Sequence, residues 1–263
     1  MPTPAAPPGN RWPPAPGSTW ILDLDGVVWL QGQPIAGAAH ALAVLGERGD
    51  RVLFATNNSV PTVAELCRRL AGVGVDVTPQ DVLSSAQSAA RLVQPGEQVL
   101  AVGGPGLREA LQAAGAELVD RSPADVVMVG WSKSFGVDEM TRAMVAVRAG
   151  ARFIGTNEDA TFPTPDGLLP GSGAFLAAIA TASGATPQIA GKPHQPMVDL
   201  IQERAGAVHV AVGDRPATDG ALARRLGVPF ALVLSGVTGP GDEVGSPAPD
   251  AQATDLGALV SSL

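Results

Sequence analysis

Short, almost uninterrupted apolar runs recur along this chain, and segments with a helical spacing of apolar residues lie between them. Four of the runs are Trp20–Leu24, Val52–Ala55, Val208–Val212 and Phe230–Leu234. A strand that is apolar on both sides has to be covered on both faces of its sheet, as in the parallel sheets of α/β proteins. The sequence therefore predicts a Rossmann-like, doubly wound parallel sheet.

The middle of the chain carries a second set of strand-like runs. These are Val99–Val102, Val126–Val129 and Arg152–Ile154, with helical segments at 107–114 and 138–149. The runs either extend the first sheet or form a second α/β unit. The stretch 156–173 is rich in proline and glycine and is predicted to be a loop.

The charge of the chain excludes one class of partner. Its 263 residues include 17 Lys and Arg against 25 Asp and Glu, which gives a formal net charge of −8. Because binding to a phosphate backbone needs a basic surface, we expect no nucleic-acid polymer as a partner. The single cysteine, Cys67, excludes an internal disulfide framework and a cysteine-rich zinc site, and it is predicted to be a buried structural thiol.

Residues 1–17 contain seven prolines and no apolar run. This composition predicts a flexible, Pro-rich tail rather than a signal peptide. No segment of the sequence reaches the roughly 18–20 apolar residues of a membrane-spanning helix. We therefore expect no membrane partner and a cytoplasmic location.

Polar clusters follow four of the predicted strands. They are Asp-Leu-Asp-Gly-Val at 23–27, Thr-Asn-Asn-Ser at 56–59, Gly-Lys-Pro-His at 191–194 and Gly-Asp-Arg-Pro-Ala-Thr-Asp at 213–219. Functional groups of an open parallel sheet gather at the carboxyl ends of its strands. Four polar clusters in these positions indicate a functional site.

The first and fourth clusters suit a cation. Asp23 and Asp25 are two residues apart, so both side chains can point the same way before Gly26 turns the chain. Their carboxylates repel each other, and Mg²⁺ would relieve the repulsion. Asp214 adds a third acidic group, and Asp219 can orient the ligands from behind. The alternatives are a strand-end turn for the first pair and a helix N-cap for Asp214.

The second and third clusters suit an anion. Thr56, Asn57 and Asn58 offer a hydroxyl, two amides and backbone N–H groups where a helix begins, and Lys192 supplies a positive point charge. Taken singly, they also fit an ordinary helix cap and a solvated surface lysine. Together with a Mg²⁺ site they indicate phosphate binding, and an aspartate there can attack phosphorus in line.

In this order and at these strand ends, the four clusters resemble the four motifs of the haloacid dehalogenase (HAD) superfamily of phosphatases. Segments 84–89, 129–131, 148–157 and 170–173 resemble its NagD-like branch, the p-nitrophenylphosphatase and phosphoglycolate or pyridoxal phosphate phosphatase group. The resemblance covers about residues 18–240. Four ordered motifs are far more specific than any one of them.

The resemblance implies a Mg²⁺-dependent phosphomonoesterase that acts through an aspartyl-phosphate on Asp23. Asp25 would be the general acid and then the general base. The side chains of Asp23 and Asp214 and the backbone carbonyl of Asp25 would hold Mg²⁺, with Asp219 in the shell behind them.

The resemblance also implies that Thr56, Asn57 and Asn58 bind the phosphoryl oxygens and that Lys192 pairs with Asp23 and the transferring group. The substrate would be a small phosphorylated metabolite. Nucleotides, sugar phosphates, glycerol phosphate, phosphoglycolate and pyridoxal phosphate all stay open.

An inserted α/β cap is a further implication. It would span residues 98–185, between core segments 18–97 and 186–263, and would exclude water and select the substrate. Trp131 and the loop 157–166 are candidates to face the substrate, although Trp131 fits the cap core equally well. Phe162 replaces a histidine of some pyridoxal phosphate-active relatives, which puts that substrate in question. A homodimer through the cap is an option.

Two other functional classes use the same residue types. A phospho-acceptor signalling module is disfavoured because the acceptor-like aspartate of this chain lies on the first strand and because a large insert follows the second cluster. A non-catalytic binding module on the same fold is disfavoured because Asp23, Asp25, Thr56, Lys192 and Asp214 are all present.

Overall fold

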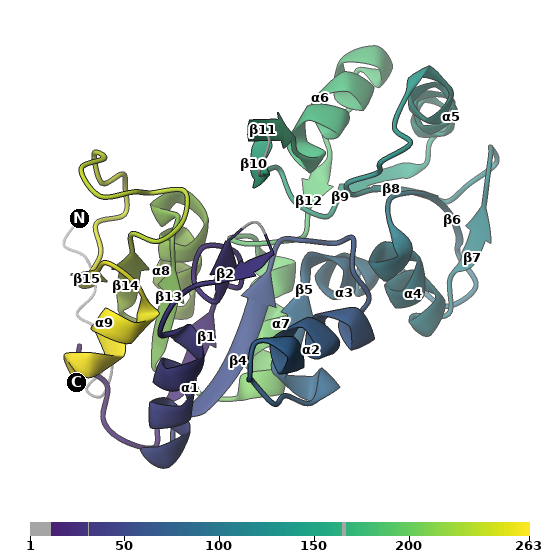
Figure 1. Cartoon of the computed structure of the whole chain (residues 1–263). Helices are drawn as coiled ribbons and strands as arrows, with labels where there is room; N and C mark the ends of the chain where they lie inside the picture. The colour runs from purple at the N-terminus through teal and green to yellow at the C-terminus, as the bar shows by residue number, and fades with distance from the viewer. Residues whose placement is uncertain (1–11, 31, 165–166) are drawn as a thin grey trace, which may run out of the picture. The chain divides into compact units, whose positions relative to one another are not determined.

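The computed structural model describes residues 12–30, 32–164 and 167–263 (Figure 1). The chain forms two compact units. The first contains the described residues up to Ala55 together with 67–82 and 198–263, and the second contains 56–66 and 83–197. Residues 1–11 of the predicted tail lie outside the described residues.

A six-stranded sheet in the order β15-β14-β13-β1-β4-β5 forms the centre of the first unit. Each of the pairings β1–β13, β1–β4, β13–β14 and β14–β15 is parallel. The strands are β1 (Thr19–Leu22), β4 (Arg51–Thr56), β5 (Val82–Ser84), β13 (Val210–Gly213), β14 (Phe230–Val233) and β15 (Ala251–Ala253). The predicted Rossmann-like parallel sheet is confirmed.

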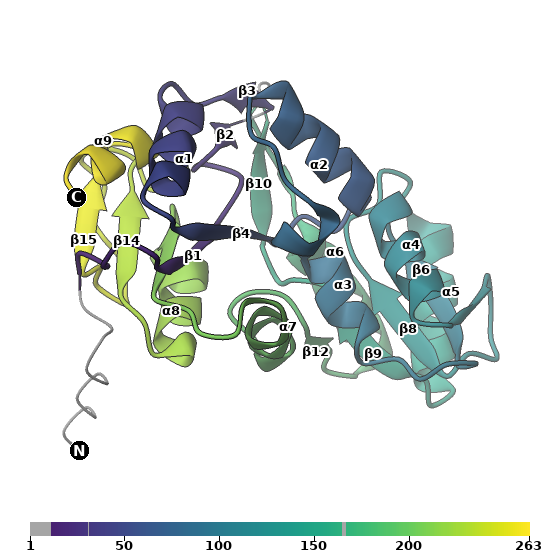
Figure 2. The same cartoon turned by 90° about the horizontal axis from the view of Figure 1, so that it is seen from below.

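Helices cover both faces of this sheet. Figure 2 shows α1 (Ala38–Glu47) and α9 (Leu256–Ser261) on one face and α8 (Ala221–Leu226) on the other. The side chains of Trp20, Leu22, Phe54 and Phe230 are at most 1% exposed. Strands this apolar require covered faces, which is why the chain returns through helices between them.

The remaining elements near this sheet are short connectors and two helices. The helices are α2 (Val63–Gly72) and α7 (Gln195–Ala205). After β1 the chain makes a small antiparallel pair, β2 (Trp29–Leu30) with β3 (Gln33–Pro34). A 3₁₀ turn spans Pro79–Asp81 and a π-helical turn spans Pro216–Gly220.

The thiol of Cys67 on α2 is half-buried. Burial, with a smaller contribution from the Asp81 carboxylate, raises the pKa of this thiol above its ordinary value. The predicted burial of this thiol is therefore met only in part, and a thiol with a raised pKa is mostly protonated at neutral pH.

A separate five-stranded sheet, in the order β12-β9-β8-β6-β7, forms the centre of the second unit. The pairings β12–β9, β9–β8, β8–β6 and β6–β7 are all parallel. The strands are β6 (Gln98–Val102), β7 (Glu117–Val119), β8 (Val126–Val129), β9 (Arg152–Gly155) and β12 (Gln188–Ile189). The middle runs therefore form a second α/β unit and do not extend the first sheet.

Successive residues of β6 and β8 pack on opposite faces of this second sheet. Val99 and Met128 belong to a core with α3 (Ser85–Ala90) and α4 (Pro105–Ala113). Leu100 and Val127 belong to a core with α5 (Val137–Arg148) and α6 (Ser172–Ser183). The period of two along a strand thus supplies both cores.

The predicted loop 156–173 contains an antiparallel hairpin, so that part of the loop prediction is wrong. Its strands are β10 (Thr161–Thr164) and β11 (Gly167–Pro170). Proline and glycine are depleted in strands, and a stretch rich in both was therefore predicted to be a loop. Residues 165–166 of the candidate substrate loop lie outside the described residues.

All of the described residues between 98 and 185 fall in the second unit, which also includes 56–66, 83–97 and 186–197. The neighbouring α3 packs on the second sheet because its alanines meet β6 and β8 there. The division into a catalytic core and a cap with boundaries at 98 and 185 stays a prediction.

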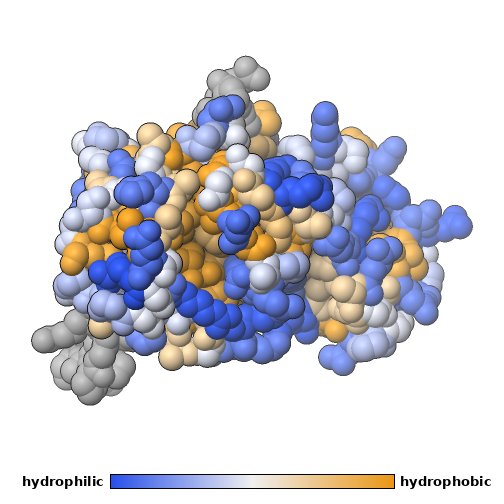
Figure 3. All heavy atoms as spheres, turned by 60° about the horizontal axis from the view of Figure 1, so that its bottom comes forward, coloured by the Kyte–Doolittle hydropathy of each residue, from blue (hydrophilic) through white to orange (hydrophobic). Residues whose placement is uncertain are grey.

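Hydrophilic and hydrophobic residues are mixed on the face that Figure 3 shows. Exposed large hydrophobic side chains include Val137, Val145, Leu168 and Leu169. Scattered apolar side chains of this kind are normal on a protein surface. Among the helices that can be described, none is both long and apolar enough to cross a membrane.

Candidate active site

Strand order places two of the predicted aspartates side by side. From β1 the chain first builds β4 and later returns to build β13 on the other side of β1. This reversal is the switch point at which open α/β sheets bind ligands. Asp23 directly follows β1, Asp214 directly follows β13, and the backbone N–H of Asp23 donates to Val212 at 2.9 Å.

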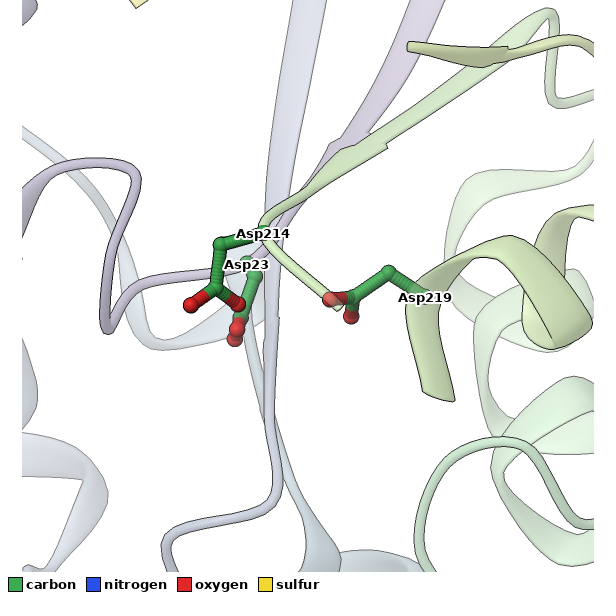
Figure 4. Close-up of side chains that lie close together, drawn as sticks. All are labelled: Asp23, Asp214 and Asp219. Carbon is green, nitrogen blue, oxygen red and sulfur yellow. The ribbon is translucent and has the colours of Figure 1, made fainter. Parts of the chain in front are cut away.

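Three carboxylates meet at this switch point. One ligand oxygen from each of Asp23, Asp214 and Asp219 lies within 4.8 Å of the other two (Figure 4). Asp214 and Asp219 are buried, and Asp23 is half-buried. We call these three side chains the carboxylate cluster. Asp219, expected behind the ligands, belongs to the same group of three.

Backbone N–H groups orient each member of the carboxylate cluster. Leu24 donates to Asp23 Oδ1 at 2.8 Å, and Arg215 donates to Asp219 Oδ2 at 3.1 Å. Val237, in the turn after β14, donates to Asp214 Oδ2. Three carboxylates this close repel one another, so the arrangement favours a bound cation.

Gly26 makes room for the cluster. Its φ of +85° is a conformation that other L residues rarely adopt, and a Cβ on it would lie 2.5 Å from Asp214 Oδ2. The turn after β1 therefore needs glycine for two reasons, backbone conformation and space.

The side chain of Asp25 is exposed, and among the described residues the carboxylate cluster does not include it. Its Oδ1 accepts a hydrogen bond of 3.0 Å from Nε1 of the buried Trp29. The indole fixes the direction of a carboxyl group that still has access to solvent. Metal binding by the backbone carbonyl of Asp25 stays a prediction.

The predicted phosphate-binding residues lie together in the second unit. Thr56 is 1% exposed, and its Oγ1 accepts a hydrogen bond of 3.0 Å from Asn58 N–H. Lys192 is 3% exposed. The backbone of Lys192 is hydrogen-bonded to the side chain of Asn57 on both its N–H and its C=O. The structure thus brings Thr56, Asn57, Asn58 and Lys192 into one cluster.

Two further polar residues belong to this cluster: Ser85 had no predicted role, and Asn157 begins the loop that was predicted to face the substrate. Ser85 and Asn157 are at most 5% exposed and both donate to the backbone carbonyl of Asn57. Each of them follows a strand, as the predicted site residues do. Both residues also lie in segments that carry the resemblance to the NagD-like branch, 84–89 and 148–157.

Two protein-family models match parts of the chain. Residues 20–117 match "Haloacid dehalogenase-like hydrolase", and residues 189–259 match "HAD-hyrolase-like". The two matches contain all four polar clusters. They leave most of the second sheet's later strands unmatched.

Among curated relatives, the D-glycerol 3-phosphate phosphatase of Mycobacterium tuberculosis is 38% identical over 231 residues. The alignment covers 85% of this chain, and the chain spans 65% of that relative's length.

Among solved structures, p-nitrophenyl phosphatase from Archaeoglobus fulgidus matches with a TM-score of 0.88 and 31% identity, over 94% of this chain and 99% of that one. Glycerol phosphate phosphatase from M. tuberculosis in complex with magnesium matches with a TM-score of 0.84 and 36% identity, over 92% and 76%. Sequence motifs, sheet topology and these likenesses agree: the chain belongs to the haloacid dehalogenase-like hydrolases, in their NagD-like branch of phosphatases.

Proposed function

We propose that this chain is a Mg²⁺-dependent phosphomonoesterase that hydrolyses a small phosphorylated metabolite through an aspartyl-phosphate on Asp23. The observation that carries the proposal is the carboxylate cluster at the switch point of the first sheet. Relatives named as phosphatases, one of them solved with magnesium, support it.

The donor set of the carboxylate cluster fits Mg²⁺, a hard cation that takes oxygen ligands. Asp23 and Asp214 would hold the ion, with Asp219 beside them and the backbone carbonyl of Asp25 as the further ligand that the family resemblance implies. When bound, the ion offsets negative charge on the phosphoryl oxygens.

Asp23 is the proposed nucleophile. One of its carboxylate oxygens attacks phosphorus, the bond between phosphorus and the ester oxygen breaks, and the aspartyl-phosphate forms. The hydrogen bond from Leu24 N–H to Oδ1 limits rotation of this carboxylate. A carboxylate held in one orientation loses less freedom on reaching the transition state.

Asp25 is the proposed proton carrier. Its protonated carboxyl gives a proton to the departing alkoxide, and the resulting carboxylate then takes a proton from the water that attacks phosphorus. Orthophosphate is released and the Asp23 carboxylate is restored. The Trp29 indole N–H orients the carboxyl of Asp25 for both transfers.

Thr56, Asn58 and Lys192 are the proposed phosphate-binding residues. A threonine hydroxyl and backbone N–H groups donate to phosphoryl oxygens, and a lysine ammonium offsets their charge. Asn57 belongs to the same cluster, but its side chain is hydrogen-bonded within the protein.

The proposed substrate is a small phosphate ester, and glycerol phosphate comes first because a relative is named for it. Selectivity is proposed to come from the cap, where Trp131 meets the ring of Phe162 edge-on at 5.5 Å. The Trp131 Nε1–H donates to the carbonyl of Pro170 at 3.0 Å, so the indole is hydrogen-bonded to the hairpin that carries Phe162.

The test is hydrolysis of p-nitrophenyl phosphate by the purified protein with Mg²⁺ or with EDTA. We expect turnover in the presence of Mg²⁺ and none in the presence of EDTA. For Asp23→Asn we expect a fall in kcat of about 10³-fold or more, because the nucleophile is lost. Asp120→Asn is the matched control, since that side chain is 83% exposed and outside the cluster. A panel of small phosphate esters, beginning with glycerol phosphate, would then identify the substrate.

Two outcomes would contradict the proposal. A chain that takes up phosphate from acetyl phosphate on Asp23 and keeps it, without turnover, is a phospho-acceptor module. A chain that binds phosphate esters with no turnover, and whose Asp23→Asn variant behaves identically, is a non-catalytic binding module.

A further inference from the structure

We infer that Asn57 is a positioning residue that holds the backbone of Lys192, rather than a ligand of the phosphate. The inference rests on the proposed function, because it concerns the lysine to which that reaction assigns charge stabilisation. It reassigns one residue of the cluster from contact with substrate to support of another residue.

The side chain of Asn57 pairs with the main chain of Lys192 as a neighbouring strand would. Its Oδ1 accepts from Lys192 N–H at 2.8 Å, and its Nδ2 donates to Lys192 C=O at 3.2 Å. The same Nδ2 donates to Asp159 Oδ2 at 3.2 Å. These partners determine which way the amide is turned, since one needs an acceptor and two need a donor.

This arrangement uses up the donors of the Asn57 side chain. An amide nitrogen carries two N–H donors, and both have acceptors inside the protein. The oxygen that remains is an acceptor, which repels the oxygens of a phosphate. Asn57 can therefore bind phosphate through its side chain only by breaking a contact with Lys192 or Asp159.

The backbone of Asn57 is itself anchored. Its carbonyl accepts hydrogen bonds from Ser85 Oγ at 2.7 Å and from Asn157 Nδ2 at 2.8 Å. Gly191 lets Lys192 approach, because a Cβ there would lie 2.6 Å from Asn57 Oδ1 and 2.5 Å from the Thr156 carbonyl. We call Asn57, Ser85, Asn157, Gly191 and Lys192 the Asn57 clamp.

The Asn57 clamp holds the backbone of Lys192 beyond the end of its strand. β12 has two residues and pairs only with β9 among the described strands. A hydrogen bond of 2.9 Å from Ala190 N–H to the Gly155 carbonyl extends this pairing to two residues before Lys192. Lysine is a flexible point charge, so the position of its ammonium group depends on where its backbone is held.

The experiment is a double-mutant cycle in kcat/KM for p-nitrophenyl phosphate. It compares the wild type, Asn57→Asp, Lys192→Ala and the double variant. In Asn57→Asp a carboxylate oxygen replaces the amide nitrogen and faces the Lys192 carbonyl and Asp159, so it pushes Lys192 away. With Lys192 present, we expect Asn57→Asp to cost about 10–100-fold, the scale of a misplaced catalytic group. In the Lys192→Ala background, we expect it to cost less than about threefold.

Equal losses in the two backgrounds would overturn the inference, because a phosphate ligand or a general structural residue acts independently of Lys192. A loss of less than about threefold with Lys192 present would overturn it too. If turnover of Lys192→Ala is below detection, calorimetric binding of inorganic phosphate to the same four proteins supplies the cycle. If Asn57→Asp does not fold, Asn57→Ala removes the contacts without the repulsion and takes its place.

Ser88→Ala is the matched control. It removes another buried hydrogen bond of the second unit, from Ser88 Oγ to the Ala190 carbonyl at 2.6 Å, without touching Lys192. We expect Ser88→Ala to lower the thermal midpoint about as much as Asn57→Asp does, while its kcat/KM stays within about twofold of wild type. A loss of activity as large as that of Asn57→Asp would contradict a special role for Asn57. Absence of turnover in the wild type would refute the proposed function instead, which keeps the two failures distinguishable.

Discussion

Each residue of the carboxylate cluster sits where the chain leaves regular structure. Asp23 and Asp214 follow buried strands, and the π-helical turn Pro216–Gly220 carries Asp219 back toward them. Backbone N–H groups orient all three side chains. The cluster is therefore built by the main chain, and a substitution that moves the main chain should disturb it as much as loss of a carboxylate.

Gly26→Ala tests this dependence on the main chain. The new Cβ would meet Asp214 Oδ2, and the backbone would keep a φ of +85° only under strain. We expect weaker Mg²⁺ binding and a fall in kcat of about 10-fold or more, because a shift of about 1 Å is costly in an active site. Steady-state rates across a Mg²⁺ titration measure both effects.

Gly32→Ala is the control for that variant. Its φ is +79°, so it carries the same backbone strain, but a Cβ there meets nothing within 4 Å. If both variants weaken Mg²⁺ binding equally, strain and not crowding against Asp214 is the cause.

The carboxylate cluster was predictable because strand ends in a parallel sheet converge on one edge, and Asp23 and Asp214 each follow an apolar run. The Asn57 clamp was not predictable. Asn57 and Lys192 are 135 residues apart, and their contact depends on the rotation of one amide. Residue types and spacing carry no information about that rotation, so Asn57 looked like another phosphate ligand.

At the scale of elements, the second unit depends on a sheet that is packed on both faces. Leu107 of α4 is fully buried against one of these faces. Leu107→Ala should lower the free energy of unfolding by about 2–5 kcal/mol, through lost burial and the cavity that remains. Urea denaturation followed by circular dichroism measures the change.

Leu168→Ala on β11 is the control at this scale. It removes the same atoms from a side chain that is 69% exposed. A change within about 0.5 kcal/mol is expected for such a surface site. Equal effects of the two substitutions would mean that α4 does not rely on this core.

The strands that sequence patterns identified are those with long apolar runs, such as β4, β8 and β13. The strands that were missed are short or carry few large apolar side chains. β15 reads Ala-Gln-Ala, and the hairpin β10–β11 contains two prolines. Their pairing comes from the neighbouring strands, which an alternation pattern does not record.

At the scale of the whole molecule, Mg²⁺ binding should increase the stability of the folded chain against unfolding. A ligand that binds only the folded chain adds about 2.7 kcal/mol at 100 times its Kd. We therefore expect Mg²⁺ to raise the thermal midpoint and EDTA to reverse the rise. Differential scanning calorimetry across a Mg²⁺ series measures the shift.

Asp214→Asn should abolish that shift, because it removes a charge from the carboxylate cluster. Asp242→Asn should keep it, since that carboxylate bonds to Gly239 N–H in an exposed turn. A midpoint that rises equally in both variants would indicate general screening of the net charge of −8 rather than binding at the cluster.

The position of β13 beside β1 also has a consequence for biosynthesis. The backbone N–H of Thr19 donates to a histidine 190 residues further along the chain, so one side of β1 has no partner while most of the chain is still being translated. Pairing between strands so distant in sequence forms slowly and leaves an edge open to wrong partners. A nascent chain arrested before residue 210 should therefore lack the metal site and require chaperone protection, even if its second unit has already folded.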